Sequence, residues 1–390
     1  MNKKVLFVLR SAGIGGTATS MYNLLSLFKE QGVDADVLLF SYDGPFTEQF
    51  KSVSNLLPEE KILAAVSCSS STLKKRGVVS YAIRIAYALS HRVIGVRLTN
   101  EFFYKLSARK FDKKYSAVVA FQEDLTTEYA MHIKADKRIA WCHMDYDTVA
   151  KASHRSIERS KEIYSKYDYI MCVSEIIKNS MVEKLGWPEE KIDVVYNTIP
   201  PEYIKSRAED ALEDKLLERE FCFISMGRLV DRKRFDRVIF AAEALKSKNV
   251  EFVWYILGDG PEREKIESMI KESSLENNVI LLGAKTNPFP YIKVADCFVM
   301  SSENEGQPMV LNEALTLGKP VISTEFASSK EVVNNRVNGL IVPNSTQGLI
   351  GGVSLFVDDE FVRRTINDGA QKFAYNNDGI LRQVRRVVGI

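Results

Sequence analysis

Cysteine is scarce in this 390-residue sequence, which contains five cysteines and no CxxC pair. Four of the five lie in apolar stretches, where a free thiol behaves as a small buried hydrophobe. The five cysteines are Cys68, Cys142, Cys172, Cys222 and Cys297. This usage favours a reducing compartment. We predict a cytoplasmic protein, peripheral at most to the inner face of the cell membrane.

Long apolar runs are also lacking. The first run, at residues 5–9, is interrupted by Arg10 and then followed by a glycine-rich turn, which predicts a buried strand rather than a signal segment. No stretch approaches the roughly 18 to 20 apolar residues that span a bilayer. Any membrane contact would therefore be peripheral.

An excess of charge of either sign is missing, because 53 Lys and Arg residues nearly balance 51 Asp and Glu residues and leave a net charge of +2. A chain with this balance carries no obvious electrostatic footprint for nucleic acid. Its 45% of hydrophobic and 27% of charged residues are typical of a globular protein. Its length favours two domains.

What the sequence does contain is an alternation of short apolar runs with helical patterns. The runs that predict strands are residues 5–9, 35–40, 116–121, 138–142, 169–174 and 193–197, then 221–227, 252–258, 278–283, 297–302, 319–324 and 339–343. Strands that alternate with helices form parallel sheets covered on both faces. The two series therefore predict two doubly wound α/β domains, with a ligand groove between them.

Two prolines mark the boundary between these domains, because Pro200 and Pro201 directly follow the last strand of the first series. We predict a first domain over residues 1–198 and a second over residues 199–376. A charged helix is expected beyond the prolines, from Ala208 to Glu220.

Residues 73–114 stand apart in composition. They contain eleven Lys or Arg residues and two acidic ones, interleaved with aromatic and aliphatic side chains. One interpretation is a solvated pair of basic helices. The other is a surface for peripheral membrane contact or for a phosphate-bearing acceptor, since basic amphipathic helices bind anionic interfaces.

Glycine-rich turns follow strands in both predicted domains. Gly13, Gly15 and Gly16 come directly after the first strand and before a helical stretch, and Gly258 and Gly260 follow a strand of the second domain. Glycine lets backbone N–H groups approach an anion, and a helix N-terminus adds the positive end of its dipole. A plain tight turn is the alternative in each case.

Two cations follow the first strand of the predicted second domain. Gly227 ends the run FCFISMG, and Arg228 and Lys233 come shortly after it. Open α/β sheets bind ligands at the carboxyl ends of their strands, and two cations there suit a diphosphate. Simple pairing of these cations with Asp231 and Asp236 is the alternative.

Two glutamates, Glu305 and Glu313, flank a Gly-Gln-Pro turn. Pro308 predicts the first turn of a helix whose N–H groups, over residues 306–309, carry partial positive charge. Eight residues at 100° each would leave the carboxylates about 80° apart around the helix and about 12 Å apart along it. That separation suits hexose hydroxyls at one glutamate and ribose hydroxyls at the other. It disfavours a glycosidase pair.

His143 ends another predicted strand, and this position in a chain with four histidines favours a functional role over a structural one. With Cys142, Asp145 and Asp147 it could suggest a metal cluster, and the two aspartates could suggest a metal-binding DxD motif, which belongs to a different fold. That fold normally carries its acids in a single nucleotide-binding domain. We therefore predict no metal and no other cofactor, with the cations stabilising the leaving diphosphate.

Together these motifs resemble the GT-B-fold glycosyltransferases of family 4, which use nucleotide sugars with retention of anomeric configuration. The likeness covers nearly the whole chain and rests on the two glutamates, the GRLxxxK motif of residues 227–233, the Gly-Asp-Gly-Pro turn of 258–261 and the early glycines. It implies two Rossmann-like domains that face each other across a cleft, and a helix over 377–390 that packs back on the first domain. The Gln307-Pro308 pair resembles the form that this motif takes in bacterial capsule or teichoic acid transferases.

The resemblance also implies roles for single residues. The catalytic residues would be Arg228 and Lys233 at the diphosphate, and Glu305 and His143 at the reacting sugar. The donor-binding residues would be Gly15, Gly16, Gly227, Gly258, Gly283, Gly306, Gln307, Pro308, Met309 and Glu313, the last at the ribose. Residues 282–288 and Tyr291 would border the nucleobase.

The sequence thus predicts a retaining glycosyltransferase that moves a hexose-type sugar from a nucleotide diphosphate sugar, with UDP-sugar favoured, to a cell-envelope glycan, teichoic acid or lipid-linked acceptor. An enzyme similar to the non-hydrolysing nucleotide-sugar epimerases is one alternative. A catalytically silent partner subunit is another, although the intact cations and glutamates argue against it.

Overall fold

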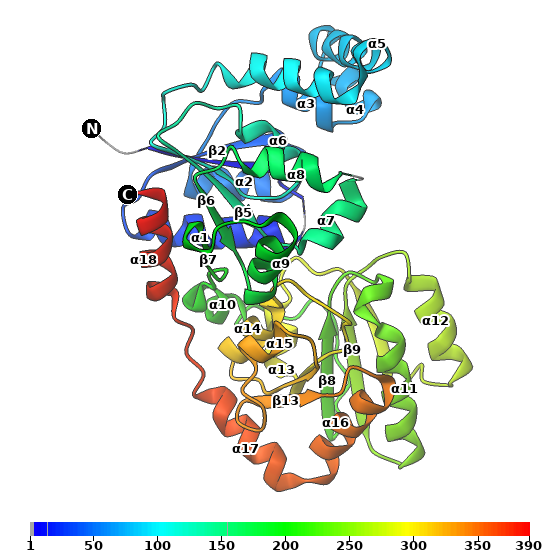
Figure 1. Ribbon diagram of the computed structural model, residues 1–390. Helices are drawn as coiled ribbons and strands as arrows, with labels where there is room; N and C mark the ends of the chain where they lie inside the picture. Colours follow the sequence, from blue (N-terminus) through cyan, green and yellow to red (C-terminus); the bar gives the residue numbers. More distant parts are fainter. Residues whose placement is uncertain (1–3, 14, 154) are drawn as a thin grey trace. The chain divides into compact units, whose positions relative to one another are not determined.

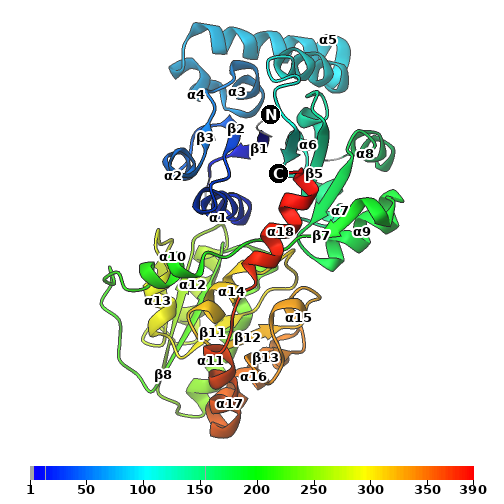
Figure 2. The ribbon, with the colours of Figure 1, turned by 90° about the vertical axis from the view of Figure 1, so that its left-hand side faces the viewer.

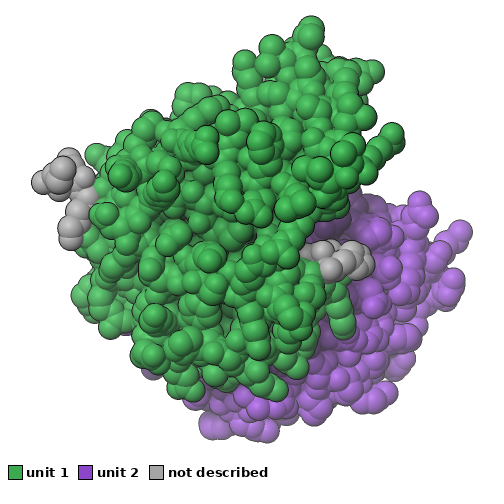
Figure 3. Space-filling model, turned by 45° about the horizontal axis from the view of Figure 1, so that its top comes forward, with its two compact units in different colours: residues 1–198, 377–390 green, residues 199–376 purple. Residues whose placement is uncertain are grey.

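The computed structural model describes residues 4–13, 15–153 and 155–390, and the chain divides into two compact units (Figures 1 and 3). Unit 1 comprises residues 1–198 and 377–390, and unit 2 comprises residues 199–376. Each unit is built around its own parallel sheet with helices on both faces. The expected fold class, α/β with two doubly wound Rossmann-like domains, is confirmed.

The sheet of unit 1 has seven strands in the order β3-β2-β1-β4-β5-β6-β7, and the pairs are parallel. The strands are β1 (Val5–Ser11), β2 (Ala35–Ser41), β3 (Asn55–Leu56), β4 (Ala117–Ala120), β5 (Lys137–Cys142), β6 (Tyr169–Cys172) and β7 (Ile192–Val194). Six of them fall on the predicted apolar runs. The seventh, β3, has only two residues, so no run signals it.

The helices of unit 1 follow its strands. They are α1 (Gly16–Glu30), α2 (Phe46–Val53), α3 (Lys61–Ser67), α4 (Ser70–Lys75), α5 (Val78–Ala108), α6 (Leu125–Ala130), α7 (Tyr146–Ser153), α8 (Ile157–Tyr164), α9 (Glu175–Leu185) and α18 (Asn377–Val388). Figure 2 shows α3, α4 and α5 grouped together at one end of the unit. Among the described residues, no helix combines the length and apolarity needed to cross a bilayer.

Helix α18 contacts the sheet of unit 1 although it comes last in the chain. Gln383 Nε2 donates to Val194 O at 2.8 Å, and Lys137 Nζ donates to Val387 O at 3.2 Å. Val384 is fully buried. The C-terminal residues are therefore part of unit 1.

The sheet of unit 2 has six strands in the order β10-β9-β8-β11-β12-β13, again paired in parallel. The strands are β8 (Phe221–Met226), β9 (Phe252–Leu257), β10 (Val279–Gly283), β11 (Cys297–Met300), β12 (Val321–Thr324) and β13 (Gly339–Val342). The helices are α10 (Pro201–Arg207), α11 (Phe235–Ser247), α12 (Arg263–Glu272), α13 (Phe289–Val294), α14 (Met309–Thr316), α15 (Ser329–Val332), α16 (Thr346–Asp358) and α17 (Glu360–Gln371).

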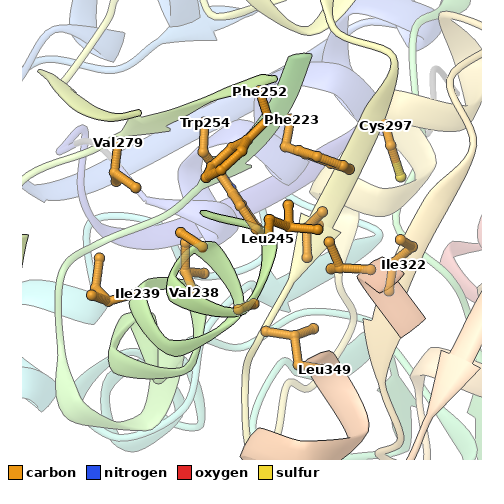
Figure 4. Packing of buried hydrophobic residues seen from close by; sticks show 14 of the residues in the cluster. Phe223, Val238, Ile239, Leu245, Phe252, Trp254, Val279, Cys297, Ile322 and Leu349 are labelled. Carbon is orange, nitrogen blue, oxygen red and sulfur yellow. The ribbon is translucent and has the colours of Figure 1, made fainter. Parts of the chain in front are cut away.

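Alternate side chains of these strands enter separate cores on the two faces of the sheet. Phe223 and Trp254 belong to one core, with Leu245 of α11, as Figure 4 shows. Their neighbours Ile224 and Val253 belong to the other. Burial on both faces explains why the strands read as continuous apolar runs rather than as alternating patterns.

The prediction of a helix from Ala208 to Glu220 is wrong. The helix in this region is α10, which ends at Arg207, and the following residues form turns and irregular structure. Leu217 N–H donates to the hydroxyl of Tyr255 at 2.6 Å, and Lys285 Nζ lies 2.6 Å from a carboxylate oxygen of Asp214. These tertiary contacts hold the segment in an irregular conformation and override its helix propensity.

Candidate active site

The ends of three neighbouring strands in unit 2 bring predicted glycines together. Gly227 N–H donates to Leu257 O at 2.9 Å, and Gly258 N–H donates to Gly283 O at 2.8 Å. A Cβ atom on Gly258 would lie 1.9 Å from Gly227 O, and its φ of +136° is unfavourable for other residues. Close backbone packing thus requires glycine at 258, at the carboxyl edge where such sheets bind ligands.

Lys233 and Glu305 meet beside this glycine edge. Lys233 Nζ lies 2.6 Å from Glu305 Oε1, and the two side chains are 13% and 11% exposed. The Lys233 Cε atom is 3.3 Å from the position that a Cβ on Gly227 would occupy. The structure therefore brings Glu305 to two predicted site residues, Gly227 and Lys233, that precede it by about 70 residues in the sequence.

The alternative reading of the two cations does not hold, since neither Arg228 nor Lys233 pairs with Asp231 or Asp236 in the described structure. Asp236 pairs with Arg234 at 2.8 Å instead. The Arg228 side chain is exposed and has no carboxylate partner among the described residues. Its charge is available to a ligand.

Sequence reasoning missed a network that supports this turn. Arg234 has a φ of +51°, and its guanidinium binds Asp236 and Glu303. These two carboxylates raise the pKa of Arg234. Arg237 donates to the side-chain oxygen of Asn344 at 2.6 Å. The network ties the turn after β8 to the end of β11, and the spacing of Arg234 and Asp236 two residues apart is the only sequence signal for it.

The turn before α14 differs from the expected helix geometry. The helix begins at Met309, and Pro308 has a ψ of +78°, so Glu305 lies outside the helix and the predicted 80° and 12 Å do not apply. Pro308 has no N–H group, and Met309 N–H donates to Gln307 O at 2.9 Å. N–H donors were expected at residues 306–309. The N–H group of Gly306 has no acceptor among the described residues, so it stays available to a ligand.

Glu313 is buried inside α14, with 8% of its surface exposed. Burial raises the pKa of its carboxyl from 4.5 to about 7. None of the described residues makes a hydrogen bond or ion pair with this carboxylate. An unpaired buried carboxylate is costly, and in a ligand-binding fold it marks a candidate binding group.

Two other features of unit 2 lie outside the predicted site. Tyr291 is 2% exposed and its hydroxyl donates to Asp214, so its side chain is held within unit 2, and its place beside a nucleobase stays a prediction. A cavity of about 390 Å³ lies at the end of β12, lined by Glu325, Phe326, Ala327, Lys330 and Asn344. None of the predicted site residues lines it.

In unit 1, the predicted glycines stand at the start of α1. The helix begins at Gly16 with Gly15 as its N-cap, and a Cβ on either glycine would meet nothing within 4 Å. Packing therefore does not require glycine here, unlike at Gly258. Ile14, in the middle of the motif, lies outside the described residues.

His143 follows β5 and is held through its backbone. The N–H of His143 donates to Glu123 Oε1, and the N–H of Met144 donates to the same oxygen at 2.7 Å. Burial lowers the pKa of His143 to about 3, so the imidazole is neutral at pH 7. Its Nε2 is buried and unpaired among the described residues.

Glu123 is a buried residue that sequence reasoning missed. It is 4% exposed, and burial raises the pKa of its carboxyl from 4.5 to about 7. The sequence signal is an acidic residue two positions after the run at 116–121, which forms β4, the neighbour of the strand β5 that His143 follows.

The residues that could suggest a metal cluster, from Cys142 to Asp147, lie at the end of a strand and at the start of a helix. Cys142 is buried in β5, and Asp147 in α7 lies 3.8 Å from Lys184. Within residues 4–13, 15–153 and 155–390, no group of three His, Cys, Asp or Glu side chains is arranged to hold a metal ion. That the protein works without a metal stays a prediction.

Two doubly wound units, the second with glycines and charged side chains at the carboxyl ends of its strands, define the GT-B class of folds. A family model described as "Glycosyl transferases group 1" matches residues 207–373, and one described as "Glycosyltransferase Family 4" matches residues 14–203. Together they cover almost the whole chain. Each model matches one part of the chain, and together with the fold they support a GT-B glycosyltransferase, in agreement with the resemblance seen in its motifs.

Individual relatives are similar over parts of their length. The chain is 29% identical over 211 residues to the Campylobacter jejuni N-acetylgalactosamine-N,N'-diacetylbacillosaminyl-diphospho-undecaprenol 4-alpha-N-acetylgalactosaminyltransferase, covering 54% of this chain and 56% of that protein. It spans about half the length of the curated relatives it matches, between 41% and 59% for four of them.

Solved structures share the fold over the whole chain. Anabaena HepE in complex with UDP has a TM-score of 0.70 at 16% identity, covering 99% of both chains. S. aureus TarM in complex with fondaparinux, alpha-GlcNAc-glycerol and UDP has a TM-score of 0.71 at 15% identity, covering 100% of both. Likeness at this identity concerns the fold alone.

Proposed function

We propose that this protein is a retaining glycosyltransferase that transfers a hexose-type sugar from a nucleotide diphosphate sugar, with UDP-sugar as the favoured donor, to a cell-envelope acceptor. The observation that carries the proposal is the ion pair of Lys233 and Glu305 beside Gly227, at the carboxyl edge of the unit 2 sheet. A cation and a sugar-binding carboxylate at one strand end suit the phosphate and the hexose of a single ligand.

Unit 2, residues 199–376, binds the donor in this proposal. Lys233 and the unpaired Arg228 contact the diphosphate, and Glu305 accepts hydrogen bonds from hexose hydroxyls. Glu313 accepts hydrogen bonds from the ribose hydroxyls, which would supply the hydrogen bonds that its buried carboxylate does not form with the protein. The strand-end glycines allow the phosphates to approach the backbone.

Unit 1, residues 1–198, contributes the acceptor side. The neutral imidazole of His143 contacts the reacting sugar, and Gly15 and Gly16 leave space for a phosphate at the start of α1. Because the fold does not need glycine at these two positions, access for a ligand is a reason for it to be there.

The reaction retains the anomeric configuration in this proposal. The bond between the anomeric carbon and the diphosphate oxygen breaks, the acceptor oxygen bonds to the same face of that carbon, and the acceptor proton passes to the departing diphosphate. Arg228 and Lys233 stabilise the charge on the leaving group. No protein nucleophile and no metal ion are required. NMR of the product glycoside reports the anomer, and inversion would reject this mechanism.

The acceptor is a cell-envelope glycan, a teichoic acid or a lipid-linked sugar. The undecaprenol-linked substrate in the name of the C. jejuni relative and the glycerol-linked GlcNAc bound to TarM support this class. The protein would meet such acceptors at the inner face of the cell membrane, from the cytoplasm.

A donor screen tests the proposal. Purified protein is incubated with a panel of nucleotide sugars, with and without membrane extract as acceptor, and nucleotide release is measured. We expect release from one UDP-sugar that depends on the extract. Release without any acceptor, together with rearranged sugar, would instead support an epimerase. If no nucleotide or nucleotide sugar binds in calorimetry, the silent partner subunit is the better account.

A further inference from the structure

Helix α5 leaves one side uncovered while its other side is packed. Tyr87 and Phe103 form a core with Ile62 of α3. Ten large hydrophobic side chains of the same helix are exposed, which is most of those exposed in the described structure. The outer face of α5 consists of Val78, Val79, Ile85, Leu89, Val93, Ile94, Val96, Leu98, Phe102 and Leu106.

These side chains form a stripe rather than a scatter. Val78, Ile85, Leu89 and Val93 fall within about 80° of one another at 100° per residue. Val78 is 86% exposed and Val93 is 81% exposed. The helix breaks at Gly95, with a φ of +81°, and Figure 2 shows its two arms running in different directions. The break adds a corner of exposed apolar residues to the stripe.

Cations border the stripe. The surrounding residues 73–114 contain eleven Lys or Arg residues and two acidic ones. Arg92 and Arg109 are exposed, and neither pairs with a carboxylate in the described structure. Four other cations of this segment, Arg76, Arg97, Lys105 and Lys110, have acidic partners, so the unpaired charge beside the stripe comes from residues such as Arg92 and Arg109.

We propose that the outer face of α5 binds an anionic lipid bilayer, with its apolar side chains in the acyl boundary and Arg92 and Arg109 at the level of the lipid phosphates. Basic amphipathic helices bind interfaces in this way, through apolar burial and attraction to anionic lipid. The inference goes beyond the transfer reaction, because it concerns where the protein lies rather than what it transfers.

A second copy of the chain fits this face less well. A symmetric dimer places the same patch of each subunit against the other. Arg92 and Arg109 of both subunits would then lie in one interface, and unpaired like charges in a desolvated interface are costly. An anionic bilayer supplies the opposite charge and a continuous apolar layer.

Vesicle flotation of the full-length protein tests the proposal. We expect binding to phosphatidylglycerol–phosphatidylcholine vesicles that weakens with added salt, and little binding to phosphatidylcholine alone. The triple variant Ile85→Ser, Leu89→Ser, Val93→Ser should lower the bound fraction on the order of fivefold or more. Phe361→Ser, which removes an 80% exposed side chain in unit 2, is the matched control and should bind as the wild type does.

A second variant and a second measurement keep the test independent of folding and of the transfer reaction. Arg92→Glu with Arg109→Glu should also reduce binding to anionic vesicles, while circular dichroism and UDP affinity of both variants stay at wild-type values. No binding by the wild type, or equal binding by the triple variant, would overturn the proposal. So would a wild-type dimer in light scattering that the triple variant converts to monomers. Failure of UDP binding alone would count only against the transferase.

Discussion

Glu313→Gln should remove the pH dependence of nucleotide-sugar binding. Burial raises the pKa of the Glu313 carboxyl from 4.5 to about 7, so the group is about 9% ionised at about pH 6 and about 91% ionised at about pH 8. The ionised form offers both oxygens as acceptors to the two ribose hydroxyls, whereas the protonated form turns one oxygen into a donor and binds them more weakly. If the bound carboxylate stays ionised, affinity rises about tenfold between these pH values, which is about 1.4 kcal/mol.

Calorimetry with UDP-glucose at several pH values measures this effect. A nucleotide sugar is the right ligand because its diphosphate is esterified at both ends and does not titrate in this range, unlike that of free UDP. Glu313→Gln should bind more weakly at high pH and show a flat profile. The exposed Glu360→Gln, which loses only a surface ion pair with Arg364, should keep the wild-type slope. A Glu313→Gln profile identical to that of the wild type would refute the ribose assignment.

Three further predictions follow from particular contacts. Lys233→Ala should lower the transfer rate on the order of 10² or more by removing charge from the leaving group, with surface Lys248→Ala as control; near-normal turnover would contradict the role. Gly258→Ala should lower the free energy of unfolding in urea by roughly 2 kcal/mol or more, because its Cβ would lie 1.9 Å from a backbone oxygen. Gly15→Ala should unfold at nearly the wild-type urea concentration, because its Cβ would meet nothing within 4 Å. Equal unfolding midpoints for the two variants would disprove the contrast. The folded protein holds a proton on Glu123 between about pH 4.5 and 7, whereas the unfolded chain releases it. The free energy of unfolding should therefore fall by at most about 3 kcal/mol as the pH rises across that window. Glu123→Gln should lose less stability than the wild type between about pH 5 and pH 8, and equal losses would count against this reasoning.

The strands could be predicted because their signal is local. A parallel sheet buried on both faces needs continuous apolar runs, and six runs in each unit supply them. The helix expected at 208–220 failed because the contacts that hold this segment, from Tyr255 and Lys285, come from distant parts of the chain. Propensity carries no information about such contacts.

The residues of the proposed site could be named from the sequence, but their arrangement could not. Motif spacing singled out Lys233 and Glu305, yet their 2.6 Å contact depends on how the strands are ordered in the sheet. The helical arithmetic for Glu305 and Glu313 failed because the helix begins only at Met309. Glu123 was overlooked because an acid after a strand looks like a solvated loop residue until its burial is known.

The central claim is that one nucleotide sugar lies along the carboxyl edge of the unit 2 sheet. The most direct test is a crystal structure of the protein with a bound UDP-sugar. The account predicts the diphosphate within hydrogen-bonding distance of Arg228 and Lys233, and the ribose hydroxyls on Glu313. A nucleotide bound away from these side chains, for example in the cavity beside Lys330, would contradict it.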